Sequence, residues 1–165
     1  ASLARGKIFV FIDSDTTVPK NFFDTLSEVF LDPSVGGTNC NVMPSDDVAP
    51  NRTEKLFYSL WSVLRSIFYR IKPCGTGDNG IIVRNEIFNA VNGFDEDMGT
   101  MEDLDFVLRA SRHGRFVFLR ELTLTESMRR IRKTGIMRFT AIYIFNFIYY
   151  LIRGKPRISA WPPIR

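Results

Sequence analysis

The chain has 165 residues, of which 45% are hydrophobic and 24% charged, and this is the composition of one folded domain. It excludes a disordered chain, a collagen-like repeat and a protein made only of membrane spans. Cys40 and Cys74 form neither a disulfide framework nor a close-spaced zinc motif, so we expect buried thiols in a reducing compartment. No signal peptide leads the chain, and a first residue of Ala rather than Met indicates a trimmed or partial chain.

The net charge of +4 conceals an asymmetry along the chain. Residues 127–165 hold nine basic and no acidic residues, whereas residues 1–126 hold 13 basic and all 18 acidic ones. An acidic body with a basic tail suggests a cation held by carboxylates, and a phosphate or lipid headgroup bound by the tail. Nucleic acid is a poor partner, because the acidic body would repel its backbone and no nucleic-acid-binding motif occurs.

The first half of the chain alternates between strand and helix patterns. An apolar run at 7–12 predicts a buried strand, and the spacing of apolar residues after Pro19 predicts a helix that ends at 32–33. A second strand is expected at 35–43. A long amphipathic helix is expected at 53–71, and its apolar side chains are Leu56, Phe57, Leu60, Trp61, Leu64, Ile67 and Phe68.

The second half continues the alternation. A Gly-rich loop leads into a strand at 80–83 and a short helix, the acidic loop GFDEDMGTMED leads into a helix from about 102 to 113, and RFVFL at 115–119 is another strand. Strands that alternate with helices predict an α/β sandwich with a largely parallel or mixed sheet.

The segment 141–152 (AIYIFNFIYYLI) is apolar and aromatic almost throughout. As a helix it would be about 18 Å long, too short for the ~30 Å hydrocarbon core of a bilayer. Its flanking basic residues suit a helix that lies in the membrane interface. A core helix or an oligomer contact explains the pattern equally well, and both interpretations remain open.

Two acidic motifs stand where ligands gather in α/β proteins. Asp13-Ser14-Asp15 directly follows the first strand, and in a turn its carboxylates can converge on a hard cation or a sugar hydroxyl. Alone, this motif is more often a turn or a cap. Six acids lie between Asp95 and Asp105, and a carboxylate among them could serve as a general base toward a hydroxyl, although helix capping alone would also explain those at 102–105.

The remaining motifs are weaker. Arg129 and Arg130, with Arg132 and Lys133, offer cationic groups that suit a diphosphate, although a solvated basic face explains them equally well. The loop GTGDNG lacks the Gly-Lys-Ser/Thr ending of a phosphate loop, and we interpret it as a turn that shapes an acceptor site with Gly77, Asp78 and Asn79.

In this order, the motifs resemble those of the inverting glycosyltransferases of family 2, which have the GT-A fold. The resemblance is carried by ARGKIFVFIDSDTTVPKNFF, by GTGDNGIIVRNEIFNAVNGFDEDMGTMEDLDFVLRASRHGR and by ESMRRIRKTG, and it covers about residues 1–140. It implies a partial GT-A (nucleotide-diphospho-sugar transferase) fold, with a mixed sheet flanked by helices and a C-terminal amphipathic helix. We expect a catalytic core at 1–135 and a basic, aromatic helix and tail at 136–165.

The resemblance also implies roles for single residues. Asp13 and Asp15 would contact the nucleoside-diphosphate sugar, with Asp15 binding Mn²⁺ or Mg²⁺. Asp103 would deprotonate the acceptor hydroxyl, with Glu102 orienting the acceptor. Arg129 and Arg130 would stabilise the leaving diphosphate. The acceptor would be a glycan or a lipid-linked molecule, as in cell envelope polysaccharide synthesis, and the location would be cytoplasmic, with peripheral contact to an anionic membrane.

The chain departs from the family in one respect. Family members begin with a strand–helix–strand unit that holds the nucleobase, and this chain starts after that unit. Either it is a fragment of a longer enzyme, or it is a non-catalytic, transferase-like binding module with a membrane-facing basic tail. A nucleotidyltransferase would also use metal-binding aspartates, but the Glu102-Asp103 motif disfavours it.

Overall fold

The computed structural model describes residues 3–45, 49–71, 80–158 and 160. Its described strands form one sheet in the order β1-β3-β2-β4. They are β1 (Ile8–Phe11), β2 (Val35–Pro44), β3 (Ile81–Arg84) and β4 (Arg115–Glu126). β3 runs antiparallel to β1 and β2, and β2 runs parallel to β4, so the mixed sheet that we predicted is confirmed.

The strand β4 is longer than predicted, because the pairing with β2 continues beyond residue 119. Cys40 pairs with Leu119, but the next residue of β2, Asn41, pairs with Thr123, which leaves an irregularity in β4. Pairing then resumes and ends at Glu126. The extension carries the chain from the middle of the sheet to the basic segment, which begins three residues after β4 ends.

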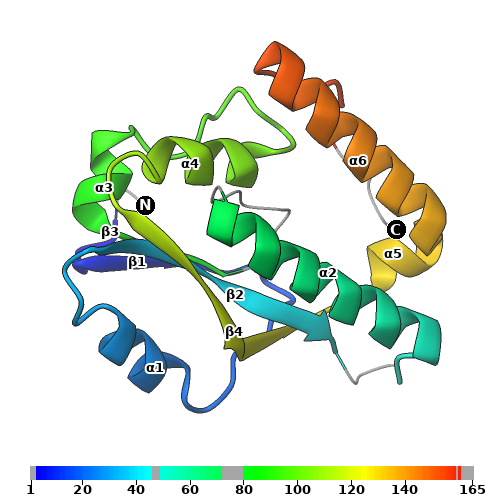
Figure 1. Cartoon of the computed structure of the whole chain (residues 1–165), viewed down its shortest axis with the longest axis horizontal. Helices are drawn as coiled ribbons and strands as arrows, with labels where there is room; N and C mark the ends of the chain where they lie inside the picture. Colours follow the sequence, from blue (N-terminus) through cyan, green and yellow to red (C-terminus); the bar gives the residue numbers. More distant parts are fainter. Residues whose placement is uncertain (1–2, 46–48, 72–79, 159, 161–165) are drawn as a thin grey trace.

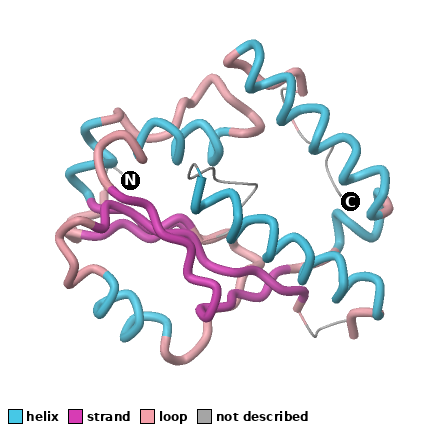
Figure 2. Tube along the Cα trace, viewed as in Figure 1, coloured by secondary structure: helices cyan, strands magenta, loops and turns pink. Residues whose placement is uncertain are grey.

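Helices cover both faces of the sheet (Figures 1 and 2). On one face lies α1 (Phe22–Val29), whose Phe22 and Leu26 pack against Cys40 and Ile82. On the other face, α3 (Asn85–Ala90) and α4 (Glu102–Ala110) pack against Ile81 and Val83. Adjacent residues of β3 thus enter different cores, since successive side chains of a strand point to opposite faces. The buried thiol that we expected is confirmed for Cys40, and Cys74 lies outside the described residues.

The helix α2 (Arg52–Ile71) has nearly the predicted bounds but faces the sheet with its polar side. Tyr58, Ser62, Arg65 and Tyr69 are buried, together with Glu54, while most of the apolar stripe is exposed, including Leu56, Leu60, Leu64, Ile67 and Phe68. The reason is the surface beneath it. That surface offers polar partners: the hydroxyl of Tyr69 donates to Asn39 of β2 and that of Tyr58 donates to Glu126 of β4, while Arg65 lies over the ring of Phe118.

Two further helices follow the sheet, α5 (Arg129–Thr134) and α6 (Ile136–Arg153). One face of α6 packs on the body of the protein, which is the core-helix interpretation of this segment. Asn146 is fully buried: its amide donates to Thr100 Oγ1 at 3.1 Å, and its oxygen accepts from the backbone N–H groups of Arg157 and Ile158. The hydroxyl of Tyr150 donates to Asp105 of α4 at 2.8 Å.

The opposite face of α6 is exposed and apolar, with Ile144, Phe145, Ile148, Leu151 and Ile152. None of the helices in the described part of the chain is long and apolar enough to cross a membrane. The boundary that we expected at residue 135 falls between α5 and α6. That residues 1–135 and residues 136–165 form separate units stays a prediction.

Candidate active site

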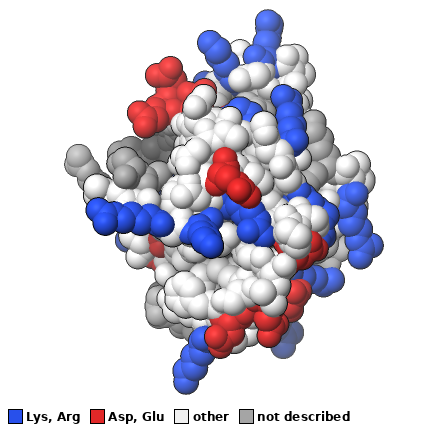
Figure 3. All heavy atoms as spheres, turned by 90° about the vertical axis from the view of Figure 1, so that its left-hand side faces the viewer, with Lys and Arg blue, Asp and Glu red and all other residues white. Residues whose placement is uncertain are grey.

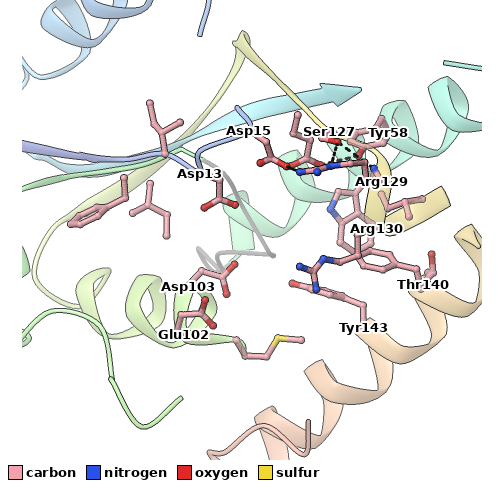
Figure 4. A pocket seen from close by; sticks show the side chains of 18 of the residues that line it. Asp13, Asp15, Tyr58, Glu102, Asp103, Ser127, Arg129, Arg130, Thr140 and Tyr143 are labelled. Carbon is pink, nitrogen blue, oxygen red and sulfur yellow. Dashed lines mark hydrogen bonds and ion pairs between the residues drawn. The ribbon is translucent and has the colours of Figure 1, made fainter. Parts of the chain in front are cut away.

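A pocket of about 910 Å³ lies where β1 and β4 end, and α2, α4, α5 and α6 contribute to its walls (Figure 4). Among the side chains that line it are Asp13, Asp15, Glu102, Asp103, Arg129 and Arg130. The structure thus brings together six residues that the sequence spreads over more than one hundred positions. The expected acceptor residues Gly77, Asp78 and Asn79 lie outside the described residues.

Asp13 and Asp15 enter the pocket from the turn after β1, which the N–H of Thr16 closes by donating to the carbonyl of Asp13 at 3.1 Å. Burial raises the pKa of Asp13 above its usual range, and the negative charge of Asp15 raises it further, while Arg130 lowers it. Burial is the largest cause of this shift, and the repulsion between the two carboxylates is the smaller one.

These two carboxylates fit a divalent ion that is shared with a substrate. Mg²⁺ is typically held by one or two carboxylates together with substrate phosphates rather than by an all-protein cage. Within the described residues no group of three His, Cys, Asp or Glu side chains forms a cage. Asp13 and Asp15 would therefore hold Mn²⁺ or Mg²⁺ jointly with the oxygens of a diphosphate.

Arg129 reaches the same turn from α5. Its Nη2 lies 3.4 Å from Oδ2 of Asp15, and its Nε donates to Ser127 Oγ at 3.1 Å (Figure 4). Both ends of the ion pair are exposed, at 73% for Arg129 and 41% for Asp15, so it contributes little to stability. It nonetheless places a guanidinium beside the carboxylate that would hold the metal.

The six-residue helix α5 is anchored by an ion pair that the sequence analysis missed. Nε and Nη2 of Arg132 lie 2.8 and 2.9 Å from the two carboxylate oxygens of Glu54, whose side chain is 6% exposed. The hydrogen bond from Arg132 is the main cause that lowers the pKa of Glu54. Glu54 also forms a reciprocal capping box with Asn51 at the start of α2. The spacing Asn51-x-x-Glu54 was the available signal.

Glu102 and Asp103 open α4 and line the pocket, whereas Asp105 does not. One oxygen of Asp105 accepts from Tyr150, and the other pairs with Arg109 at 2.6 Å. The preceding residue, Met101, is buried and has a left-handed backbone with φ of 61°. Such a conformation is strained in a residue other than glycine, and strain of this kind is often found at functional sites.

The pocket also contains residues for which the sequence suggested no role. The hydroxyl of Tyr58 donates to Glu126 Oε1 at 2.8 Å, and burial is the main cause that raises the pKa of Tyr58. Four other aromatic side chains from helices line it as well, Phe57, Trp61, Phe139 and Tyr143. In the sequence, the apolar character of these four residues does not distinguish pocket residues from residues of the hydrophobic core.

The outer surface around α1 and α3 carries mixed charge. Figure 3 shows Lys and Arg side chains interspersed with groups of Asp and Glu on this face, rather than gathered in one basic patch. The pocket differs from this face, because its acids come from the turn after β1, the end of β4 and the start of α4, whereas its two arginines both come from α5.

The model of glycosyl transferase family group 2 matches residues 8–149, and the chain belongs to that family.

Comparison with solved structures bears on the fold. The mannosyltransferase PcManGT from Pyrobaculum calidifontis, in complex with GDP-Man and Mn²⁺, is similar with a TM-score of 0.65 and 19% identity, over 94% of this chain and 42% of that one. Mannosyl-3-phosphoglycerate synthase from Rubrobacter xylanophilus has a TM-score of 0.47 and 17% identity, over 98% of this chain and 52% of that one. No curated protein sequence matches. The similarity to PcManGT confirms the GT-A fold. This chain spans less than half of the length of PcManGT.

Proposed function

We propose that the chain carries the reaction site of a metal-dependent, inverting glycosyltransferase, which moves a sugar from a nucleoside diphosphate to a hydroxyl or lipid-phosphate acceptor. The observation that carries the proposal is the single pocket in which two acid pairs and an arginine pair meet. Membership of the family supports the class of reaction. The GDP-Man and Mn²⁺ bound by PcManGT support the class of donor and the use of a divalent cation.

On the donor side, Asp13 and Asp15 would hold the divalent ion, which when bound would supply positive charge to offset that of the diphosphate. Arg129 and Arg130 face the same region from α5 and stabilise the charge that builds on the departing nucleoside diphosphate. Arginine suits this task because its fork matches two phosphate oxygens at once.

On the acceptor side, Asp103 takes the proton from the acceptor hydroxyl and Glu102 orients the acceptor. The acceptor oxygen forms a bond with the anomeric carbon as the bond from that carbon to the phosphate oxygen breaks, and the electron pair leaves with the diphosphate. Because the attack comes from the face opposite the leaving group, the configuration of the anomeric carbon is inverted.

The exposed side of α6 supports a peripheral membrane contact on the cytoplasmic side. Phe145, Ile148 and Leu151 are about half exposed, and Arg153, Lys155 and Arg157 follow at the end of the helix. Apolar side chains beside basic ones are the pattern of a helix that lies in the headgroup region of anionic lipid. A lipid-linked acceptor would then be presented beside the pocket.

The experiment that tests the donor site is a calorimetric titration of Asp15→Asn with Mn²⁺ and a panel of nucleoside diphosphates. We expect loss of the Mn²⁺-dependent part of the affinity with an unchanged melting temperature, because a half-exposed loop carboxylate contributes little to packing. The matched control is Asp24→Asn, an exposed acid on α1 outside the pocket. Equal affinities in Asp15→Asn and the control would disprove the metal role.

A further inference from the structure

Two helices line the pocket without contributing any charge. α2 contributes Phe57, Tyr58 and Trp61, and α6 contributes Phe139, Thr140 and Tyr143. The charged residues of the pocket come from the turn after β1, the start of α4 and the segment from Glu126 to Arg130. The donor and the catalytic base account for the charged residues, and they leave the aromatic side unused.

The aromatic side chains form a connected wall. The rings of Phe57 and Trp61 are stacked, with centroids 6.2 Å apart and an interplanar angle of 16°. Trp61 meets Tyr143 edge to face at 5.7 Å, and Tyr143 in turn stacks on Phe139 at 6.4 Å. Each ring is therefore held by another, and Tyr143 is 8% exposed. A wall that is fixed before the ligand arrives costs little ordering entropy on binding.

The chemistry of this wall suits a sugar ring. A pyranose has an apolar face of C–H groups and a rim of hydroxyls, so its face packs on aromatic rings while its rim reaches polar groups. Polar groups that such a rim can reach line the same pocket, since Glu102 and Asp103 offer carboxylate oxygens there.

The size of the pocket leaves room for such a ligand. Its volume of about 910 Å³ is near the upper end of the range of ~300–1,000 Å³ that is usual for pockets holding one small ligand. Asp103 and Glu102 line this same pocket, which places a sugar on the aromatic wall in the compartment of the proposed base.

We propose that Trp61, supported by Phe57, Tyr143 and Phe139, forms the acceptor subsite and packs against the apolar face of an acceptor sugar ring, so that a ring hydroxyl faces Asp103. The proposal deepens the proposed function and rests on it for the identity of the reaction. The sugar can belong to a free glycan or to a lipid-linked one, since both present the same ring.

The test is saturation-transfer NMR on the chain with glucose, mannose, N-acetylglucosamine and their β1,4-linked disaccharides, with and without Mn²⁺ and GDP or UDP. We expect saturation of the C–H protons on one ring face of at least one saccharide. Trp61→Ala should weaken that binding about tenfold, as truncation of a stacked anchor does, while Trp61→Phe retains most of it. Circular dichroism checks the fold, and Tyr143→Leu provides a second variant if Trp61→Ala fails to fold.

The matched control is Phe68→Ala, which removes an aromatic ring from the exposed side of the same helix and should leave saccharide binding unchanged. No saturation with any saccharide, or an equal loss in the control, would overturn the subsite. A Trp61-dependent signal from geranyl phosphate with none from saccharides would assign the wall to lipid and also overturn it. Titration with nucleoside diphosphate is independent of this signal, so failure of the donor site and failure of the subsite are distinguishable.

Discussion

Asp103 and Asp105 lie two positions apart on one helix, yet their side chains have different surroundings. Asp103 lines the pocket, and its Oδ1 accepts from the N–H of Leu104 at 2.8 Å, whereas Asp105 lies outside the pocket and its two oxygens bind Tyr150 and Arg109. An acid whose oxygens already bind other groups is a poor proton acceptor for a substrate. The contacts thus favour Asp103 as the base, which is the register that the sequence suggested.

We expect Asp103→Asn to lower kcat by about 10²–10⁴-fold with little change in the KM for the donor, because general-base catalysis acts only in the transition state. Asp105→Asn should give a smaller loss of turnover and a lower melting temperature, since it weakens contacts to α6 and Arg109. Steady-state kinetics and thermal melts of both variants check this. A larger loss of kcat in Asp105→Asn would show that the register of the motif is wrong.

The raised pKa of Asp13 predicts how the stability of the folded protein depends on pH. Because burial and Asp15 raise its pKa, the folded state retains the proton of Asp13 to higher pH than the unfolded state does. Wild-type stability should therefore fall as pH rises between the ordinary and the raised pKa. We expect Asp13→Asn to melt at a higher temperature than wild type at pH 7, and the difference to vanish below the ordinary carboxyl pKa of ~4. Metal-free melts across this range provide the measurement, and a lower melting temperature at pH 7 would contradict it.

At the scale of elements, the anchoring of α5 decides where Arg129 and Arg130 lie. A helix of six residues is too short to be stable alone, so its position depends on the ion pair between Arg132 and Glu54. We expect Glu54→Gln to lower kcat/KM by up to about 10²-fold through misplaced arginines, with a rise in the Kd for nucleoside diphosphate. Glu28→Gln, an exposed acid on α1, is the control. An unchanged Kd alongside a lowered melting temperature would make the pair purely structural.

The sequence predicted the order of the elements and the acids that enter the pocket, because apolar periodicity and the place of a motif after a strand are local signals. No local signal in the sequence showed which side of α2 would be buried. Its apolar stripe satisfied the helical pattern, but Asn39 and Glu126, which pair with its tyrosines, come from strands that are distant in the chain. The aromatic wall escaped notice for the same reason, since its rings meet only when α2 and α6 pack.

At the scale of the whole molecule, α2 and α6 each expose a series of apolar side chains, and contiguous apolar surface is a common feature of membrane and protein contacts. We expect the protein to co-sediment with anionic vesicles, with ~1 kcal/mol from each well-placed Lys or Arg and partial loss at high salt. Phe145→Ser with Ile148→Ser should abolish the part that resists salt. Leu31→Ser, an exposed apolar residue beyond α1, is the control. Equal pelleting with neutral and anionic vesicles at every salt concentration would exclude the electrostatic part.

The ion pair between Asp15 and Arg129 has a consequence for how a cation and a diphosphate would affect each other's binding. A cation that binds alone separates Asp15 from its guanidinium, and a diphosphate that binds alone draws Arg129 from its carboxylate. When both bind together, each takes one member of the pair and neither charge loses its partner. If the proposed donor site binds both, we expect the two ligands to be thermodynamically coupled, each raising the affinity for the other by the same factor. Free Mn²⁺ and free nucleotide should both bind weakly, and the pair should bind as a synergistic unit.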